Sequence, residues 1–110
     1  MSPRVEVHKK LAHYYRQNDD ATKRDFHLGK MALLEGQNLY RNNKISAAIP
    51  YLQQATKYND QDAQAWFYLA ESQRCLLETE QAIMAYQKCL IIAPNHGRAL
   101  KQLRFINQKS

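Results

Sequence analysis

The stretch AQAWFYLAESQRCLLETEQAIMAYQKCLIIAPNH, residues 63–96, contains two segments in which apolar residues recur at helical spacing. We expect helices over about residues 63–76 and 79–93, with Thr79 as a candidate N-cap of the second. The large and small apolar residues that occupy regular places in these segments are Trp66, Leu69, Ala70, Ala82 and Tyr86. Small residues between two helices let the helices approach closely, so the stretch predicts a tightly packed helix pair.

The same pattern recurs one 34-residue step upstream, over residues 29–62. The small residues that fall in phase are Gly36, Ala48 and Ala55. The residues that replace the Trp, Leu and Pro of the downstream copy are Ala32, Glu35 and Asp60. A half-length copy covers residues 97–110, where Leu100 and Leu103 continue the pattern in one helix over about residues 97–107.

This pattern resembles the tetratricopeptide repeat, a 34-residue helix–turn–helix unit with large and small apolar residues at set positions. Two residues of the second copy depart from the family: Gln73 stands at position 11, where an aromatic is usual, and Cys89 at position 27, where Ala is usual. The resemblance implies an all-α superhelix of stacked helix pairs. The divisions that it implies are an N-terminal helical segment (1–28), a degenerate first repeat (29–62), a second repeat (63–96) and a C-terminal capping helix (97–110).

The N-terminal segment carries its own helical signals. Ser2 and Pro3 form a helix start, because a proline there loses no hydrogen bond. Residues 5–15 then carry an apolar stripe at helical spacing, and the polar residues 18–20 interrupt it. The following helix is expected to begin within residues 21–29.

The first repeat is expected to turn at a pair of asparagines. Its first helix should end near Arg41, and the Asn-Asn pair at residues 42–43 supplies a tight turn, since Asn tolerates left-handed geometry. Ser46 is a candidate cap for the next helix, which runs to about Tyr58. Pro50 falls near the start of that helix and is expected to remove one backbone hydrogen bond and distort it.

Composition limits the class of protein. The 110 residues make one domain at most, and a hydrophobic content of 45% is enough for a core. No run approaches the roughly 18 apolar residues of a membrane span, and MSPRVEVHKKLAHYY lacks the apolar block of a signal peptide. The two cysteines have no metal or redox spacing, so we expect reduced thiols, with Cys89 in the core and Cys75 near the surface groove. A cytoplasmic location follows.

In the tetratricopeptide family the first helix of each repeat lines a concave groove, so the resemblance implies which side chains face a partner. In the first repeat these are Lys30, Leu33, Leu34, Gln37, Tyr40 and Arg41. In the second repeat they are Gln64, Phe67, Tyr68, Glu71, Arg74 and Cys75. In the capping helix they are Arg98, Lys101, Gln102 and Phe105.

The groove positions carry five basic side chains, one acidic side chain and several aromatics. Such a surface suits an extended peptide with acidic groups and apolar anchors, because Arg pairs with carboxylates and aromatic side chains offer much contact area. The alternative is that Leu33, Leu34 and Phe67 pack against the N-terminal helix and fill the groove.

One variant of the family clamps the C-terminal carboxylate of heat-shock chaperones with Lys, Asn and Arg side chains. The residues at those positions here are Leu33, Gln37, Tyr68, Arg98 and Gln102. Only Arg98 matches the variant. The sequence therefore argues against this mode of binding.

The net charge of +6 is concentrated at the end of the chain. Residues 97–110 carry four basic and no acidic side chains. Three interpretations are open: a solvated cap, contact with an acidic partner, and contact with nucleic acid or an anionic membrane. Because strong duplex binders neutralise many phosphates along a surface, four residues on one short helix argue against nucleic acid.

Motifs for catalysis are missing from the sequence. There is no glycine-rich phosphate loop, and no Ser or Cys lies in a nucleophile motif. The four histidines form no i, i+4 metal pair. We therefore expect no enzymatic activity, no cofactor and no metal.

The sequence thus predicts a module that binds a partner polypeptide or peptide in its groove, in an adaptor or chaperone-like role. Two alternatives stay open. The first is a structural array that self-associates, with a homodimer through the tyrosine-rich N-terminal helix, because about three repeats are normally needed for stability. The second is a module of a larger enzyme that binds its substrate or partner.

Overall fold

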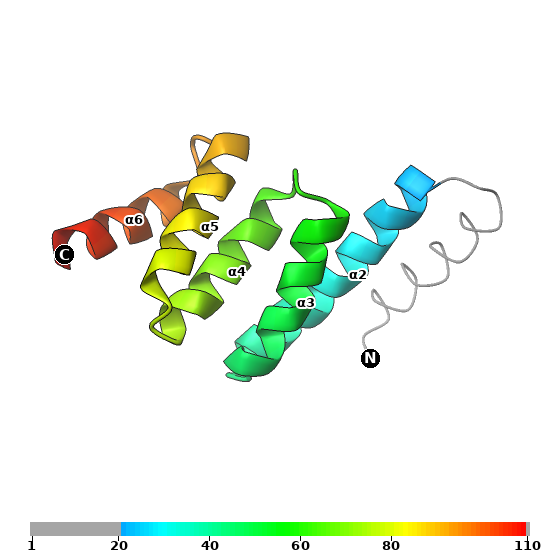
Figure 1. Cartoon of the computed structure of the whole chain (residues 1–110), viewed down its shortest axis with the longest axis horizontal. Helices are drawn as coiled ribbons and strands as arrows, with labels where there is room; N and C mark the ends of the chain where they lie inside the picture. The colour runs from blue at the N-terminus through cyan, green and yellow to red at the C-terminus, as the bar shows by residue number, and fades with distance from the viewer. Residues whose placement is uncertain (1–20, 110) are drawn as a thin grey trace.

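The computed structural model describes residues 21–109, and these residues form five α-helices and no β-strand (Figure 1). The helices are α2 (Ala21–Arg41), α3 (Ile45–Tyr58), α4 (Ala63–Cys75), α5 (Thr79–Ile92) and α6 (Gly97–Lys109). The expected all-α architecture is therefore confirmed over the described range. The predicted helix start at Ser2–Pro3, the apolar stripe of residues 5–15 and the break at residues 18–20 lie outside the described residues.

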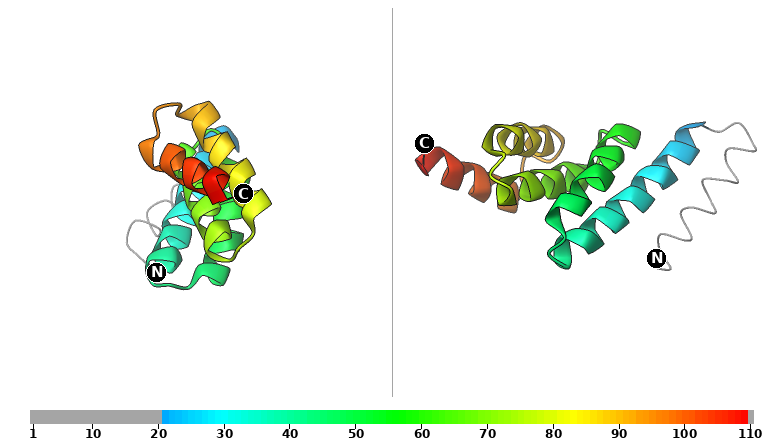
Figure 2. Two further views of the ribbon diagram at one scale, coloured as in Figure 1. Left: turned by 90° about the vertical axis from the view of Figure 1, so that its left-hand side faces the viewer. Right: turned by 60° about the horizontal axis from the view of Figure 1, so that its bottom comes forward.

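The helices follow one another in space in chain order. The pair α2 and α3 packs closely, as does the pair α4 and α5, and α3 joins the two pairs by packing on α4. The helix α6 packs on α5 and ends the array (Figure 2). None of the helices in the described range is both long and apolar enough to cross a lipid bilayer.

The 34-residue period of the sequence reappears in the backbone. Helices α4 and α6 begin at Ala63 and Gly97, and helices α3 and α5 begin at Ile45 and Thr79, so both pairs of starts are 34 residues apart. The predicted asparagine turn is confirmed, since Asn43 has a left-handed φ of 61°. Leu77, one period later, has the same geometry with a φ of 62°.

The two caps predicted for the second helices of the repeats are wrong. Ser46 is already inside α3 and Thr79 is the first residue of α5, so neither side chain stands before its helix. The residues in the cap positions are Lys44 and Glu78, and their side chains make no capping hydrogen bond. Helix α3 continues through Pro50 without a break.

Side-chain caps occur instead at the starts of α4 and α6. The Asp62 carboxylate accepts a hydrogen bond of 3.1 Å from the Gln64 backbone N–H at the start of α4. At the start of α6 the Nδ1 atom of His96 accepts one of 3.2 Å from the Ala99 N–H. Each cap satisfies an N–H group that has no partner within its own helix.

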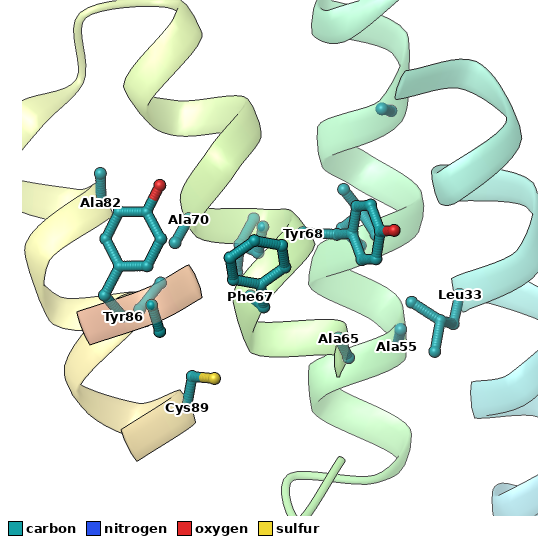
Figure 3. Packing of buried hydrophobic residues seen from close by; sticks show 14 of the residues in the cluster. Leu33, Ala55, Ala65, Phe67, Tyr68, Ala70, Ala82, Tyr86 and Cys89 are labelled. Atoms are coloured by element: carbon teal, nitrogen blue, oxygen red, sulfur yellow. The ribbon is translucent and has the colours of Figure 1, made fainter. Parts of the chain in front are cut away.

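Small residues set the distance between paired helices. A Cβ atom added to Gly36 on α2 would lie 2.6 Å from Leu52 Cδ2 on α3, which is far inside van der Waals contact. At the matching place in the next pair, Ala70 on α4 is completely buried. Leu52 and Ala70 belong to one core that runs through both pairs (Figure 3).

Candidate functional site

The carboxylate of Glu71 on α4 joins three helices, although Glu71 is only 3% exposed. Its Oε2 atom accepts a hydrogen bond of 3.1 Å from the Tyr40 hydroxyl on α2 and one of 3.2 Å from Arg74 Nη2. Its Oε1 atom accepts a hydrogen bond from the Tyr86 hydroxyl on α5. The Arg74 Nε atom also donates to the Tyr86 hydroxyl oxygen over 3.3 Å. We call these four residues the Glu71 cluster.

The surroundings of the two phenols keep them protonated. Burial and, after it, the negative charge of Glu71 together raise the pKa of Tyr40 to about 12. Burial and the hydrogen bond to Glu71 also raise the pKa of Tyr86. Both hydroxyls are therefore fixed as donors to Glu71 at neutral pH, and the charge of Glu71 is satisfied inside the protein.

A row of aromatic rings crosses the helices beside this cluster. The ring centroids of Tyr40 and Tyr68 are 5.6 Å apart, those of Tyr68 and Phe67 are 5.4 Å apart, and those of Phe67 and Tyr86 are 6.1 Å apart. Figure 3 shows Phe67 between Tyr86 and Tyr68. Tilted and edge-to-face contacts of this kind stabilise the packing of α2, α4 and α5.

Arg98 on α6 and His96, just before α6, cover the outer side of Phe67. The Arg98 guanidinium carbon lies 4.7 Å from the Phe67 ring centroid, which places a cation over the ring. The His96 and Phe67 ring centroids are also 4.7 Å apart. Phe67 is therefore only 1% exposed. It packs beneath Arg98 and His96 and does not face solvent.

The predicted groove residues differ in their exposure. The buried ones are Leu33, Phe67, Tyr68 and Glu71. The half-buried ones are Lys30, Leu34, Gln37, Tyr40, Arg74 and Gln102. The exposed ones are Arg41, Gln64, Cys75, Arg98, Lys101 and Phe105. The side chains most open to solvent thus lie at the end of α2, at both ends of α4 and on α6.

Two of the predicted basic residues already have partners within the fold. The Lys30 Nζ atom lies 2.9 Å from Asp62 Oδ2 and so ties α2 to the start of α4. Arg74 is held in the Glu71 cluster. By contrast, Arg98, Lys101 and Arg41 form no ion pair with any acidic residue of the described range.

Sequence reasoning placed Tyr40, Glu71 and Arg74 on the groove but did not bring them together with Tyr86. Helical spacing marks Tyr86 only as the large aromatic of the second helix, and nothing in the spacing shows where its hydroxyl points. No group of three or more His, Cys, Asp or Glu side chains in the described range is placed to hold a metal ion.

Comparison with known proteins gives a consistent assignment of family. A family model described as Tetratricopeptide repeat matches residues 33–97, which is more than half of the chain. No curated protein sequence matches.

Several solved structures have the same fold. The first TPR of Spaghetti (RPAP3) bound to the HSP90 peptide SRMEEVD superposes with a TM-score of 0.73 at 18% identity, over 99% of this chain and 94% of that chain. The crystal structure of MamA gives a TM-score of 0.73 at 23% identity, over 96% of this chain and 67% of that chain. The NMR structure of the first TPR domain of the human RPAP3 protein gives 0.69 at 19% identity, over 94% and 90%. At such identities the likeness establishes the fold.

Proposed function

The chain belongs to the tetratricopeptide repeat family, with two repeats followed by a capping helix, and on that premise we propose that it binds an acidic peptide segment of a partner polypeptide. The binding surface is the concave face to which α2, α4 and α6 contribute. The role that follows is that of an adaptor or chaperone-like module in the cytoplasm.

The balance of charge on this face supports an acidic peptide. The one acidic groove residue, Glu71, is buried and satisfied by its own cluster, so its charge does not oppose an anionic ligand at short range. Arg98 and Lys101 are exposed and make no ion pair within residues 21–109. Basic side chains without an ion-pair partner offer charge-assisted hydrogen bonds, and Phe105 on the same helix, 50% exposed, offers apolar contact. The exposed Arg98 and Lys101 on α6, neither of them in an ion pair within residues 21–109, are the observation that carries the proposal.

The contacts proposed here differ from a clamp on the terminal carboxylate of a peptide. The peptide bound by the Spaghetti domain, SRMEEVD, combines acidic residues with apolar ones, which is the chemistry proposed here. Among the positions that form the clamp in the co-chaperone variant, Leu33 and Tyr68 are buried in this chain and offer no cation. We therefore assign the main contacts to acidic side chains of the peptide, which Arg98 and Lys101 bind.

Selection from a phage-displayed peptide library tests this function. The wild-type chain should enrich peptides that contain several Asp or Glu residues and an apolar residue. An Arg98→Glu/Lys101→Glu variant should lose these peptides, because the variant presents two negative charges in place of two positive ones. A loss of about tenfold or more in affinity for a selected peptide is expected. The melting temperature should fall by only a few degrees, because both side chains are exposed and the internal contact that is lost is that of Arg98 with the Phe67 ring.

A charge-matched variant separates the site from net charge. Lys44→Glu/Lys57→Glu changes the net charge by the same amount, and both lysines are exposed and lie outside the groove positions. This control should retain the selected peptides. Enrichment without acidic residues, or equal loss in the two variants, contradicts binding at α6.

A further inference from the structure

The guanidinium of Arg74 is engaged along only one of its edges. Its Nε atom donates to the Tyr86 hydroxyl oxygen over 3.3 Å, and its Nη2 atom donates to Glu71 Oε2 over 3.2 Å. Both hydrogen bonds leave from the same edge of the planar group, toward the Glu71 cluster. The rest of the guanidinium carries the two N–H groups of Nη1 and the second N–H of Nη2, and these have no acceptor within residues 21–109. We call this the free edge of Arg74.

The free edge is open to solvent. The side chain of Arg74 is 33% exposed, whereas that of its ion-pair partner Glu71 is 4% exposed. Among the buried side-chain nitrogen and oxygen atoms of residues 21–109, only Gln73 Oε1 lacks a hydrogen-bond partner. Arg74 Nη1 also lacks a partner, so it is not buried, and a ligand can reach it. Glu71 lies across the guanidinium from the free edge, which is therefore the positive end of the ion pair.

The two internal hydrogen bonds hold Arg74 in one place. Tyr86 is completely buried and Glu71 is 3% exposed, so packing fixes both acceptors. A ligand on the free edge need not order a flexible side chain, and such preorganisation strengthens binding. The N–H groups of Nη1 and Nη2 that point outward are parallel, which is the geometry that pairs with both oxygens of a carboxylate.

Arg74 and Arg98 lie along the same face of α4. The Arg98 guanidinium carbon is 4.7 Å from the Phe67 ring centroid. Phe67 and Arg74 are seven residues apart on α4, so they share one face and are about 10 Å apart along its axis. In an extended, polyproline-like peptide, side chains three residues apart lie on one side and about 9 Å apart. Two acidic residues at this spacing match the two guanidinium groups.

We propose that the acidic peptide has two anchors, defined as protein sites that each bind one of its acidic side chains. Arg98 and Lys101 form the first, and the free edge of Arg74 forms the second, which binds an acidic residue three positions away in the peptide. The inference rests on the proposed function, since it concerns the same ligand on the same face. It adds a residue that selects the spacing of the acidic side chains, because Glu71 and Tyr86 keep Arg74 from following a charge placed elsewhere.

Peptides of equal composition test the spacing on the wild-type chain. The probe is acetyl-Ser-Glu-Leu-Ala-Glu-Ser-amide, in which the glutamates are three residues apart. The control is acetyl-Ser-Glu-Glu-Leu-Ala-Ser-amide, which has the same residues and charge. Titrations followed by ¹H–¹⁵N correlation spectra should show that the control binds about fivefold more weakly, because it loses one exposed ion pair. Equal affinities, or saturable shifts confined to α6, overturn the proposal.

Replacement of each glutamate of the probe by glutamine identifies its partner. Each replacement should weaken binding to the wild-type chain about fivefold. Arg98→Gln/Lys101→Gln should cancel the effect of one replacement, and Arg74→Gln should cancel the effect of the other, because a contact that is already absent cannot be lost again. Persistence of both effects in Arg74→Gln overturns the proposal.

Tyr86→Phe separates an anchor from a structural role. It removes a donor to Glu71, as Arg74→Gln does, but it keeps the guanidinium. Both effects of the glutamine replacements should persist in Tyr86→Phe. If one disappears there too, Arg74→Gln acts by disturbing the Glu71 cluster, and the second anchor is wrong. The spacing comparison uses the wild-type chain alone, so it decides the question where Arg74→Gln does not fold.

The second anchor and the proposed function fail in different ways. If Arg98→Gln/Lys101→Gln cancels one effect while Arg74→Gln cancels neither, the peptide binds α6 as proposed and only the second anchor is wrong. If the wild-type chain binds neither the probe nor its control and selects no acidic peptide, both proposals are wrong.

Discussion

The Tyr86 hydroxyl on α5 donates a hydrogen bond to the buried carboxylate of Glu71 on α4. The two residues lie on the two helices of one repeat, and Tyr40 from α2 donates to the other oxygen of the same carboxylate. This buried carboxylate is stabilised because Tyr40, Arg74 and Tyr86 all donate hydrogen bonds to it. The Glu71 cluster therefore fixes how the second helix pair sits against α2.

Removal of the Tyr86 hydroxyl should destabilise the fold. In Tyr86→Phe the ring stays packed, but Glu71 loses its donor from α5 in a buried site. The expected loss is about 1–3 kcal/mol of the free energy of unfolding, measured by urea denaturation. Tyr51→Phe is the matched control. Tyr51 is 41% exposed, so removal of its hydroxyl should hardly change the free energy of unfolding. Equal stability of the two variants would show that the buried hydrogen bond contributes little.

The stability of the protein should fall at high pH through Tyr40. Burial and the Glu71 charge raise the pKa of Tyr40 from 10.0 to about 12. A raised pKa in the folded state favours the protonated phenol, so the contribution is complete below pH 10 and is lost as the pH rises through about 12. The absorbance of tyrosinate, taken as the difference between wild type and Tyr40→Phe, should have its midpoint near 12. A midpoint near 10 would mean that neither burial nor Glu71 raises the pKa of this phenol.

Much of the fold could be predicted from two features of the sequence. Three small residues in phase, Gly36, Ala48 and Ala55, set the register of the first pair, and the structure buries the matching places in both pairs. The Asn pair at 42–43 located the first turn, because side-chain chemistry that tolerates left-handed geometry is visible in sequence. Both signals are local, which is why they are readable without the structure.

The candidate site was less predictable, because it depends on contacts between distant residues. The spacing identifies Glu71 as a groove residue, but it does not show that Tyr86 and Tyr40 reach the carboxylate. The caps failed for a smaller reason, since errors of two residues in the start of α3 and one residue in the start of α5 move Ser46 and Thr79 inside their helices. Asp62 stands directly before the second repeat and was the better sequence signal for a cap.

A methyl group at Gly36 should force α2 and α3 apart. The added Cβ atom of Gly36→Ala would lie 2.6 Å from Leu52 Cδ2 and 2.7 Å from Leu52 Cγ, so the side chain or the helices must move. Overpacking of this kind costs about 1–3 kcal/mol, which thermal unfolding can measure. Gly97→Ala is the control, since an added Cβ atom meets nothing within 4 Å there. A Gly36→Ala variant as stable as Gly97→Ala would show that Leu52 can give way without cost.

The left-handed residue Leu77 offers a route to higher stability. Leu77 has a φ of 62° and is 85% exposed, so its side chain gains little from packing while its backbone is strained. Left-handed geometry costs ordinary residues about 1–2 kcal/mol and is easier for Asn. Leu77→Asn copies the residue that stands one repeat earlier, at Asn43, where φ is 61°. We expect the variant to gain about 1 kcal/mol in the free energy of unfolding.

The reciprocal exchange tests the cause of this gain. Asn43→Leu places a leucine at the matching turn and should lower the free energy of unfolding by a similar amount, since Asn43 is exposed and loses no buried contact. Urea denaturation of both single variants, with unchanged dependence on denaturant, measures the two effects on one scale. If Leu77→Asn stabilises the protein while Asn43→Leu leaves it unchanged, the gain comes from removing an exposed apolar side chain. Opposite changes of similar size assign it to the left-handed backbone that the two turns share.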